Sequence, residues 1–250
     1  MPYGMYIAAA GAHVQSERLK VLSNNLANVD TPGFKHEFAV FQARHTEAIE
    51  RGEAEAGSGS INDLGGGVGL AETTTSFEQG NLRETRIETD MAIDGEGFFQ
   101  VEKDGKSFLT RAGNFHMSTE GRLMTRQGHS VLSVEGQPIE LDPTLPWNLF
   151  EDGTIDQVGL RIPVGLVKPR SLGDLAKAGE NLFSPLADVF QVPAGQRRIL
   201  RGYLEQSTVK PALQMMELIE TSRAYEANIK MIQNQDNMIG SLINRMLRSS

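Results

Sequence analysis

The last forty residues of the chain constrain its fold most, because residues 211–250 predict one long amphipathic helix. Apolar side chains recur there at steps of three and four residues, the spacing that places them on one helical face. Pro211 suits the first turn, where its missing N–H would have no partner in any case. At about 1.5 Å per residue the helix is roughly 55 to 60 Å long. It is therefore longer than a small domain is wide, and its apolar face needs a partner.

A partner for this face is predicted at the other end of the chain. The C-terminal stripe is interrupted only at Ser222 and Asp236, and it comprises Met215, Leu218, Tyr225, Ile229, Ile232, Ile239, Ile243 and Met246. A second stripe, interrupted once at Gln15, comprises Met5, Ala8, Ala12, Leu19, Leu22, Leu26 and Val29. Two matching stripes predict a coiled-coil-like pair of helices. The alternative is that the two helices cap one globular core, and the length of the second helix argues against it.

Short β-prone runs fill the middle of the chain, from about residue 73 to residue 200. Turn signals such as Asp104-Gly105 and Asp152-Gly153 separate them, which is typical of antiparallel strands. The predicted strands are residues 91–93, 98–103, 108–111, 115–118, 123–125, 131–134, 139–141, 149–150, 154–158 and 162–167. Residues 168–200 show only a short helical turn near Leu172.

These patterns predict an α+β fold. Long N- and C-terminal helices form a coiled-coil-like pair, and a mostly antiparallel β domain is inserted between them. The predicted segments are an N-terminal assembly helix and turn (1–35), a Gly/Ser-rich linker (36–72), a β-rich domain (73–200) and a C-terminal assembly helix (201–250) that packs with 1–35. The linker is predicted from the composition of residues 51–69, which offer little apolar surface to bury.

Composition and charge exclude several functions. The net charge of -8 and the pI near 5.2 argue against nucleic acid as a partner, because phosphate binding requires a basic face. The chain has no cysteine, which excludes disulfides, thiolate zinc sites and thiol nucleophiles. No stretch approaches about 18 apolar residues, and the N-terminus lacks a basic n-region. The sequence therefore predicts neither membrane insertion nor a cleaved signal peptide.

No catalytic, cofactor or metal site is predicted. The five histidines are scattered singly and are His13, His36, His45, His116 and His129. The glycines at 65–69 are followed by no Lys-Ser or Lys-Thr, and those at 95 and 97 precede a strand instead of a helix, so neither run predicts a nucleotide site. Asp236 is interpreted as a polar seam residue that fixes register. The chain is therefore predicted not to be an enzyme.

Motifs along nearly the whole chain resemble those of the flagellar basal-body rod and hook family of bacteria. They are Ser23-Asn-Asn-Leu-Ala-Asn-Val-Asp-Thr-Pro-Gly-Phe-Lys35, Gln79-Gly-Asn-Leu82, Asp90-Met-Ala-Ile-Asp-Gly-Glu-Gly-Phe-Phe-Gln-Val101, Thr110-Arg-Ala-Gly-Asn-Phe115 with Gly121-Arg-Leu123, Gly202-Tyr-Leu-Glu205 and Arg223-Ala-Tyr-Glu226. The signature positions are Asn24, Asn25, Leu26, Ala27, Asn28, Thr31, Gly33, Phe34, Gly95, Gly97, Phe98, Phe99, Thr110, Arg111, Gly113 and Phe115.

The resemblance implies an axial structural protein of the basal-body rod in the periplasm. Such a protein is exported unfolded, without a cleaved signal peptide, by the flagellar type III export apparatus, and it polymerises with itself and other rod proteins. Its terminal helices pack into an inner tube, and its β domain forms an outer layer. Val209-Lys-Pro211 and the compact N-terminal opening favour the proximal rod type, whereas Arg223-Ala-Tyr-Glu226 is closer to the distal type and Ser207-Thr208 stands where Ser-Asn is usual.

Polymerisation is predicted to depend on the apolar stripes of the two helices. The predicted assembly seam consists of Leu19, Leu22, Leu26, Leu218, Tyr225, Ile229, Ile232, Ile239 and Ile243. An alternative function is a non-flagellar secreted helical adaptor or surface protein, which would form a discrete complex instead of a helical polymer. An enzyme with an unrecognised site is disfavoured, because no convergent polar cluster is evident.

Overall fold

The computed structural model describes residues 3–46, 49, 51–53, 55, 57 and 65–248, which form two compact units. The helical unit comprises the described residues of 1–27, 36–76 and 209–250. The β unit comprises Asn28–Lys35 and Phe77–Thr208. Across the described ranges, no helix has the length and apolar character needed to cross a membrane.

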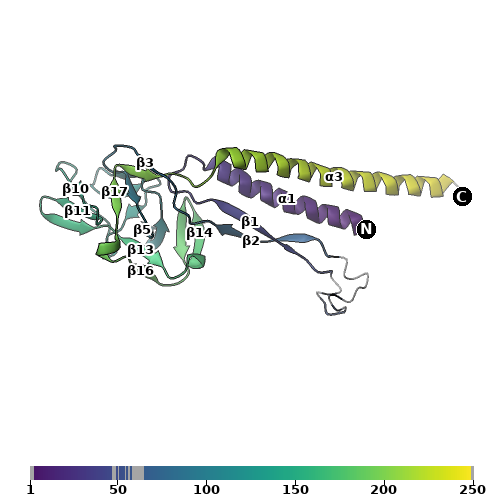
Figure 1. The fold of residues 1–250 in the computed structure, drawn as a ribbon, viewed down its shortest axis with the longest axis horizontal. Coiled ribbons are helices and arrows are strands. Elements are labelled where there is room, and N and C mark those ends of the chain that lie inside the picture. Colours follow the sequence, from purple (N-terminus) through teal and green to yellow (C-terminus); the bar gives the residue numbers. More distant parts are fainter. Residues whose placement is uncertain are drawn as a thin grey trace. The chain divides into compact units, whose positions relative to one another are not determined.

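The helical unit is built on two helices, α1 (Tyr3–Ala27) and α3 (Pro211–Arg248). They lie side by side and run in opposite directions (Figure 1). Their lengths of 25 and 38 residues differ by about 20 Å at 1.5 Å per residue. Both terminal helices predicted from the sequence are thus present, and α3 begins at Pro211.

A two-stranded hairpin completes the helical unit and packs on α1. Its strands are β1 (Glu37–Ala43) and β2 (Val68–Thr75), paired antiparallel with Glu37 opposite Thr75. These strands lie at the two ends of the predicted linker 36–72, where Phe38 and Val40 supply β propensity and α1 supplies a packing surface. Residues 54, 56 and 58–64 of the run on which the linker prediction rested lie outside the described residues.

The β unit is mostly antiparallel β structure, as predicted. Its strands are β3 (Leu82–Glu84), β4 (Met91–Ile93), β5 (Phe98–Lys103), β6 (Lys106–Thr110), β7 (Phe115–Met117), β8 (Leu123–Thr125), β9 (Ser130–Val131), β10 (Asn148–Leu149), β11 (Thr154–Gln157), β12 (Leu160–Pro163), β13 (Leu166–Pro169), β14 (Leu175–Gly179), β15 (Leu182–Pro185), β16 (Val189–Gln191), β17 (Ile199–Arg201) and β18 (Tyr203–Glu205). The largest sheet has the order β14-β15-β6-β5-β9-β8-β7, with β13 on β5 and β16 on β13. Smaller sheets pair β10-β11-β12, β17-β4 and β18-β3.

The structure differs from the predicted strands in several places. Of residues 139–141 only Glu140 forms a β-bridge, to Arg122, so this run is not a strand. β3 was not predicted, and the predicted strand 162–167 is divided between β12 and β13. Residues 168–200 contain β14, β15 and β16, and β17 and β18 follow before α3 begins, although the sequence indicated none of them. β17 and β18 are specified by distant partners, since β17 pairs with β4 and β18 with β3, whereas β14 and β15 are neighbours that pair with each other.

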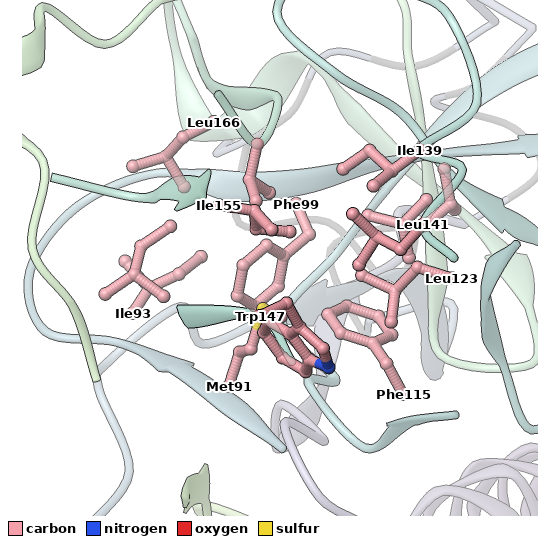
Figure 2. Close-up of a cluster of buried hydrophobic side chains, with 14 of the residues drawn as sticks. Met91, Ile93, Phe99, Phe115, Leu123, Ile139, Leu141, Trp147, Ile155 and Leu166 are labelled. Carbon is pink, nitrogen blue, oxygen red and sulfur yellow. The ribbon is translucent and has the colours of Figure 1, made fainter. Parts of the chain in front are cut away.

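The β unit holds a large buried core and a smaller cluster made of Phe98, Leu109, Val167 and Phe183. Figure 2 shows the side chains of Met91, Phe99, Phe115 and Trp147 pointing toward one another, with β-branched and leucine side chains around them. Trp147 is 8% exposed and is the single tryptophan of the sequence. Its fluorescence therefore reports the folding of the β unit alone, while helical circular dichroism reports mainly the helical unit.

The hairpin between β11 and β12 holds a strained residue. Val158 and Gly159 form its two-residue loop at φ +50° and +88°, a conformation for which Asn-Gly is the favoured pair. A β-branched residue at positive φ is an outlier, and Val158 is 76% exposed, so burial does not compensate the strain.

We expect Val158→Asn to stabilise the β unit by about 1 kcal/mol, because asparagine adopts this backbone conformation at lower cost. The free energy of unfolding, measured in urea by Trp147 fluorescence, checks this. Val158→Thr is the control, since threonine keeps the β-branch and the strain. Equal stabilisation by both substitutions would contradict the explanation.

Candidate assembly interface and buried charge cluster

The seam between α1 and α3 is formed by small and polar side chains. The buried amide of Asn25 donates to the side-chain oxygen of Gln214 over 3.3 Å. A Cβ atom added at Gly11 would lie 2.9 Å from the side chain of Asn228, and one added at Gly4 would lie 2.8 Å from Gln235. A Cβ atom at either position would displace the end of the facing side chain, and glycine avoids this displacement.

These seam positions follow one register. Positions 4, 11 and 25 of α1 and positions 214, 228 and 235 of α3 are separated by multiples of seven, and as α1 numbers fall the α3 numbers rise by the same step. Thr221, seven residues after Gln214, is 2% exposed. A seven-residue repeat keeps the same side chains in contact along two helices. The Asn25–Gln214 hydrogen bond and the close approaches of Gly11 and Gly4 to α3 therefore follow one antiparallel register.

Asn25 also joins α1 to the hairpin. Its side chain donates to the carbonyl oxygen of Glu37 over 2.8 Å and accepts from the backbone N–H of Glu37 over 3.0 Å. Next to it, burial lowers the pKa of His36, whose side chain also bonds Gln214. The signature asparagine at position 25 therefore positions three elements of the helical unit at once.

The apolar seam residues predicted from the sequence lie beside this polar seam. Leu22 is buried, and Ile243 is 51% exposed. The others are half-buried and are Leu19, Leu26, Leu218, Tyr225, Ile229, Ile232 and Ile239. The contacts between α1 and α3 therefore leave much of the apolar stripe of α3 uncovered.

Large apolar side chains are exposed along α3, both on the predicted stripe and outside it. They are 51–72% exposed and comprise Leu213, Met215, Met216, Ile219, Met231, Met238, Leu242, Ile243, Met246 and Leu247. Large apolar side chains exposed in this number along one helix are typical of a protein interaction site. The helical unit on its own thus leaves much of the apolar surface of α3 exposed.

In the β unit, the signature motifs converge on the carboxylate of Glu205. Lys35 donates to its Oε1 over 2.6 Å, the backbone N–H of Gly80 to the same oxygen over 2.8 Å, and Arg111 to its Oε2 over 3.4 Å. Lys35, Arg111 and Glu205 are 1%, 6% and 1% exposed. We call these three residues the charge cluster.

Backbone groups complete the charge cluster. Lys35 also donates to the carbonyl of Glu78 over 2.5 Å, and Arg111 donates to the carbonyl of Gly95 over 2.9 Å. Burial lowers the pKa of Lys35 and of Arg111, and the Glu205 carboxylate opposes that effect. The three side chains are buried and bond to one another and to backbone groups, except that Nε of Arg111 is buried without a hydrogen-bond partner.

Glycines allow the cluster to close. A Cβ atom at Gly33, which has φ +67°, would lie 2.4 Å from the backbone carbon of Arg111, and one at Gly80 would lie 2.1 Å from a backbone oxygen. One at Gly113 would lie 1.6 Å from the carbonyl oxygen of Met91. At these motif positions another backbone segment passes so close that a side chain larger than that of glycine would overlap with it.

The remaining signature residues have structural positions as well. Phe34, Phe98, Phe99 and Phe115 are buried, Thr110 donates to the carbonyl of Asn181 over 2.9 Å, and Gly97 has φ +124°. Thr31 bonds the side chain of Asn28 in the turn after α1. Leu26 is half-buried, whereas Asn24 and Ala27 are exposed. Within the described part of the chain, no three His, Cys, Asp or Glu side chains gather as metal ligands would.

Sequence reasoning missed the polar seam and the charge cluster. The recurrence of Gln214, Thr221, Asn228 and Gln235 at intervals of seven was visible in the sequence, but the apolar stripe was the stronger signal. Lys35 and Glu205 each end a quoted motif, yet 170 residues separate them and nothing local pairs them.

Comparison with known proteins identifies relatives across the chain. Family models match at residues 5–35 ("Flagella basal body rod protein"), 92–162 ("Flagellar hook protein FlgE/F/G D1 domain") and 200–246 ("Flagellar basal body rod FlgEFG protein C-terminal"). The flagellar basal-body rod protein FlgF of Caulobacter vibrioides is 32% identical over 248 residues, 98% of each chain. FlgG of the same organism is 33% identical over 261 residues, 93% of this chain and 95% of that one. FlgG of Borreliella burgdorferi is 32% identical over 257 residues, 96% and 97% of the two chains.

Proposed function

The chain belongs to the flagellar basal-body rod protein family, and on this premise we propose that its helical unit polymerises with neighbouring subunits into the rod. Members of this family are structural subunits of the flagellum and not enzymes. The observation that carries the proposal is the exposed apolar surface of α3, which its contacts with α1 leave uncovered. Neighbouring subunits in a polymer supply the missing apolar partners.

In the proposed assembly, α1 and α3 act together as a coiled-coil-like pair. Their seven-residue polar register supports this arrangement. The predicted seam residues Leu218, Ile229 and Ile232 flank the polar seam half-buried, so they complete their burial against another subunit. The polar seam thus specifies the pair within a subunit, and the apolar side chains join subunits.

The partners in this proposal are other copies of the chain and other axial rod proteins. The rod is placed in the periplasm, and the subunit reaches it through the flagellar export apparatus without a cleaved signal peptide. We propose the proximal position along the rod, on the strength of Val209-Lys-Pro211 and the compact N-terminal opening.

Electron cryotomography of basal bodies in the source bacterium tests the proposal, after deletion of the gene and after its complementation. A rod that stops near the inner membrane supports the proximal position, and one that stops just short of the hook assigns the distal position. Complete flagella in the deletion strain would refute a rod subunit. A secreted adaptor would then be the better interpretation, and it predicts a discrete complex of fixed stoichiometry.

A further inference from the structure

We propose that the charge cluster is a mechanical clamp, which holds the segments leading into the β unit in place when the subunit is under load. The idea deepens the proposed rod function, because a rotating rod transmits force through each of its subunits. It assigns Lys35, Arg111 and Glu205 a role in resisting force that is separate from their contribution to equilibrium stability.

The cluster residues lie close to the places where the chain passes between the two units. The chain passes between the two units after Ala27, Lys35, Ser76 and Thr208. Lys35 is the last residue before the chain leaves the β unit for the first time. Glu78 is the second residue after the chain re-enters the β unit at Phe77, and Glu205 lies three residues before Thr208, where the chain leaves it again. Force carried by the covalent chain therefore enters the β unit through segments that the cluster ties together.

Backbone hydrogen bonds bind the same segments to one another. The N–H of Gly33 donates to the carbonyl of Glu205 over 2.8 Å, and the N–H of Thr208 donates to the carbonyl of Phe34 over 3.1 Å. The N–H of Gln206 donates to the carbonyl of Asn81 over 2.8 Å. Segments 28–35, 77–81 and 203–208 are thus joined directly, and Arg111 links them to the interior of the β unit.

The chemistry of the cluster suits a clamp. Apolar contacts are non-directional, so they resist sliding poorly, whereas hydrogen bonds weaken steeply when their geometry is disturbed. A buried ion pair adds little equilibrium stability over a well-packed apolar substitute. The Glu205 carboxylate accepts hydrogen bonds from three segments. Its role is therefore better explained by holding those segments in a fixed geometry than by adding equilibrium stability.

The test compares variants that remove one of the two buried cations and leave the other paired with the Glu205 carboxylate. Lys35→Met leaves the pair of Arg111 and Glu205, and Arg111→Met leaves the pair of Lys35 and Glu205. The matched control is a truncation in the core of the β unit. Of Ile139→Val and Ile139→Ala, the variant used is the one whose melting temperature is closer to that of the cluster variants. Trp147 fluorescence measures that melting temperature.

Force is then applied to the full-length chain in optical tweezers. The chain has no cysteine, so Ala27→Cys and Lys210→Cys, both at exposed positions just outside the tied segments, accept the handles. At a fixed force we expect both cluster variants to unfold about tenfold faster than the core variant of equal melting temperature. If either one unfolds at the rate of the core variant, the clamp is overturned. No flagellum takes part in this measurement, so its failure is distinguishable from failure of the rod function, which tomography tests.

Discussion

Gly113→Ala unfolds the β unit, because no methyl group fits at this position. The added Cβ atom would lie 1.6 Å from the carbonyl oxygen of Met91 and 3.4 Å from the ring of Phe99. Both neighbours are fully buried, and the N–H of Met91 donates to the carbonyl of Gly113 over 2.9 Å. The backbone has to move at the centre of the core, and we expect a loss of roughly 4 kcal/mol or more in the free energy of unfolding.

Urea unfolding followed by Trp147 fluorescence measures this loss. Gly195→Ala is the control, because nothing lies within 4 Å of the Cβ atom added there, and its effect should stay within about 0.5 kcal/mol. The helical circular dichroism of both variants shows whether α1 and α3 are affected separately. An unchanged midpoint for Gly113→Ala would mean that the backbones at residues 91 and 113 do not approach as described.

Strands were predicted correctly where the sequence itself carries strong β propensity between turn residues. The bounds of β4, β5 and β8 match the predicted runs, because β propensity and flanking turn residues mark them. β14 and β18 carry no such pattern. Lys177 and Gly179 of β14 are poor strand residues, and they are extended because β15 pairs with them. Strand pairing therefore specifies β14 through its neighbour β15 and β18 through the distant β3.

The functional surfaces follow the same division. The stripe that periodicity predicted on α3 includes the exposed Met215, Ile243 and Met246, whereas the equally exposed Met231, Met238 and Leu242 lie outside it. The partners of Asn25 and Lys35 were not predictable, because Gln214 and Glu205 lie 189 and 170 residues away. The resemblance singled out Asn25 and Arg111 as signature positions without giving the physical reason, which the buried bonds now supply.

Ile229→Asp abolishes rod assembly while leaving the β unit folded. Ile229 is half-buried on α3, beside the polar seam, and it belongs to the helical unit. Burying a carboxylate in an apolar contact between subunits raises the free energy of that contact by several kcal/mol. In a polymer this penalty recurs at every subunit. Soft-agar motility, tomography of basal bodies and urea unfolding of the purified chain together measure both halves of the prediction.

The control for this variant carries the same charge on the same helix. Asn234→Asp lies on a different face, about 140° around the helix from Ile229, and its side chain is exposed. If added charge alone were responsible, both variants would lose motility, whereas an apolar contact predicts loss only for Ile229→Asp. Normal swimming of the Ile229→Asp strain would show that this face is not buried in the rod. The assembly seam would then have to lie on the opposite flank of α3, where Met231, Met238 and Leu242 are exposed.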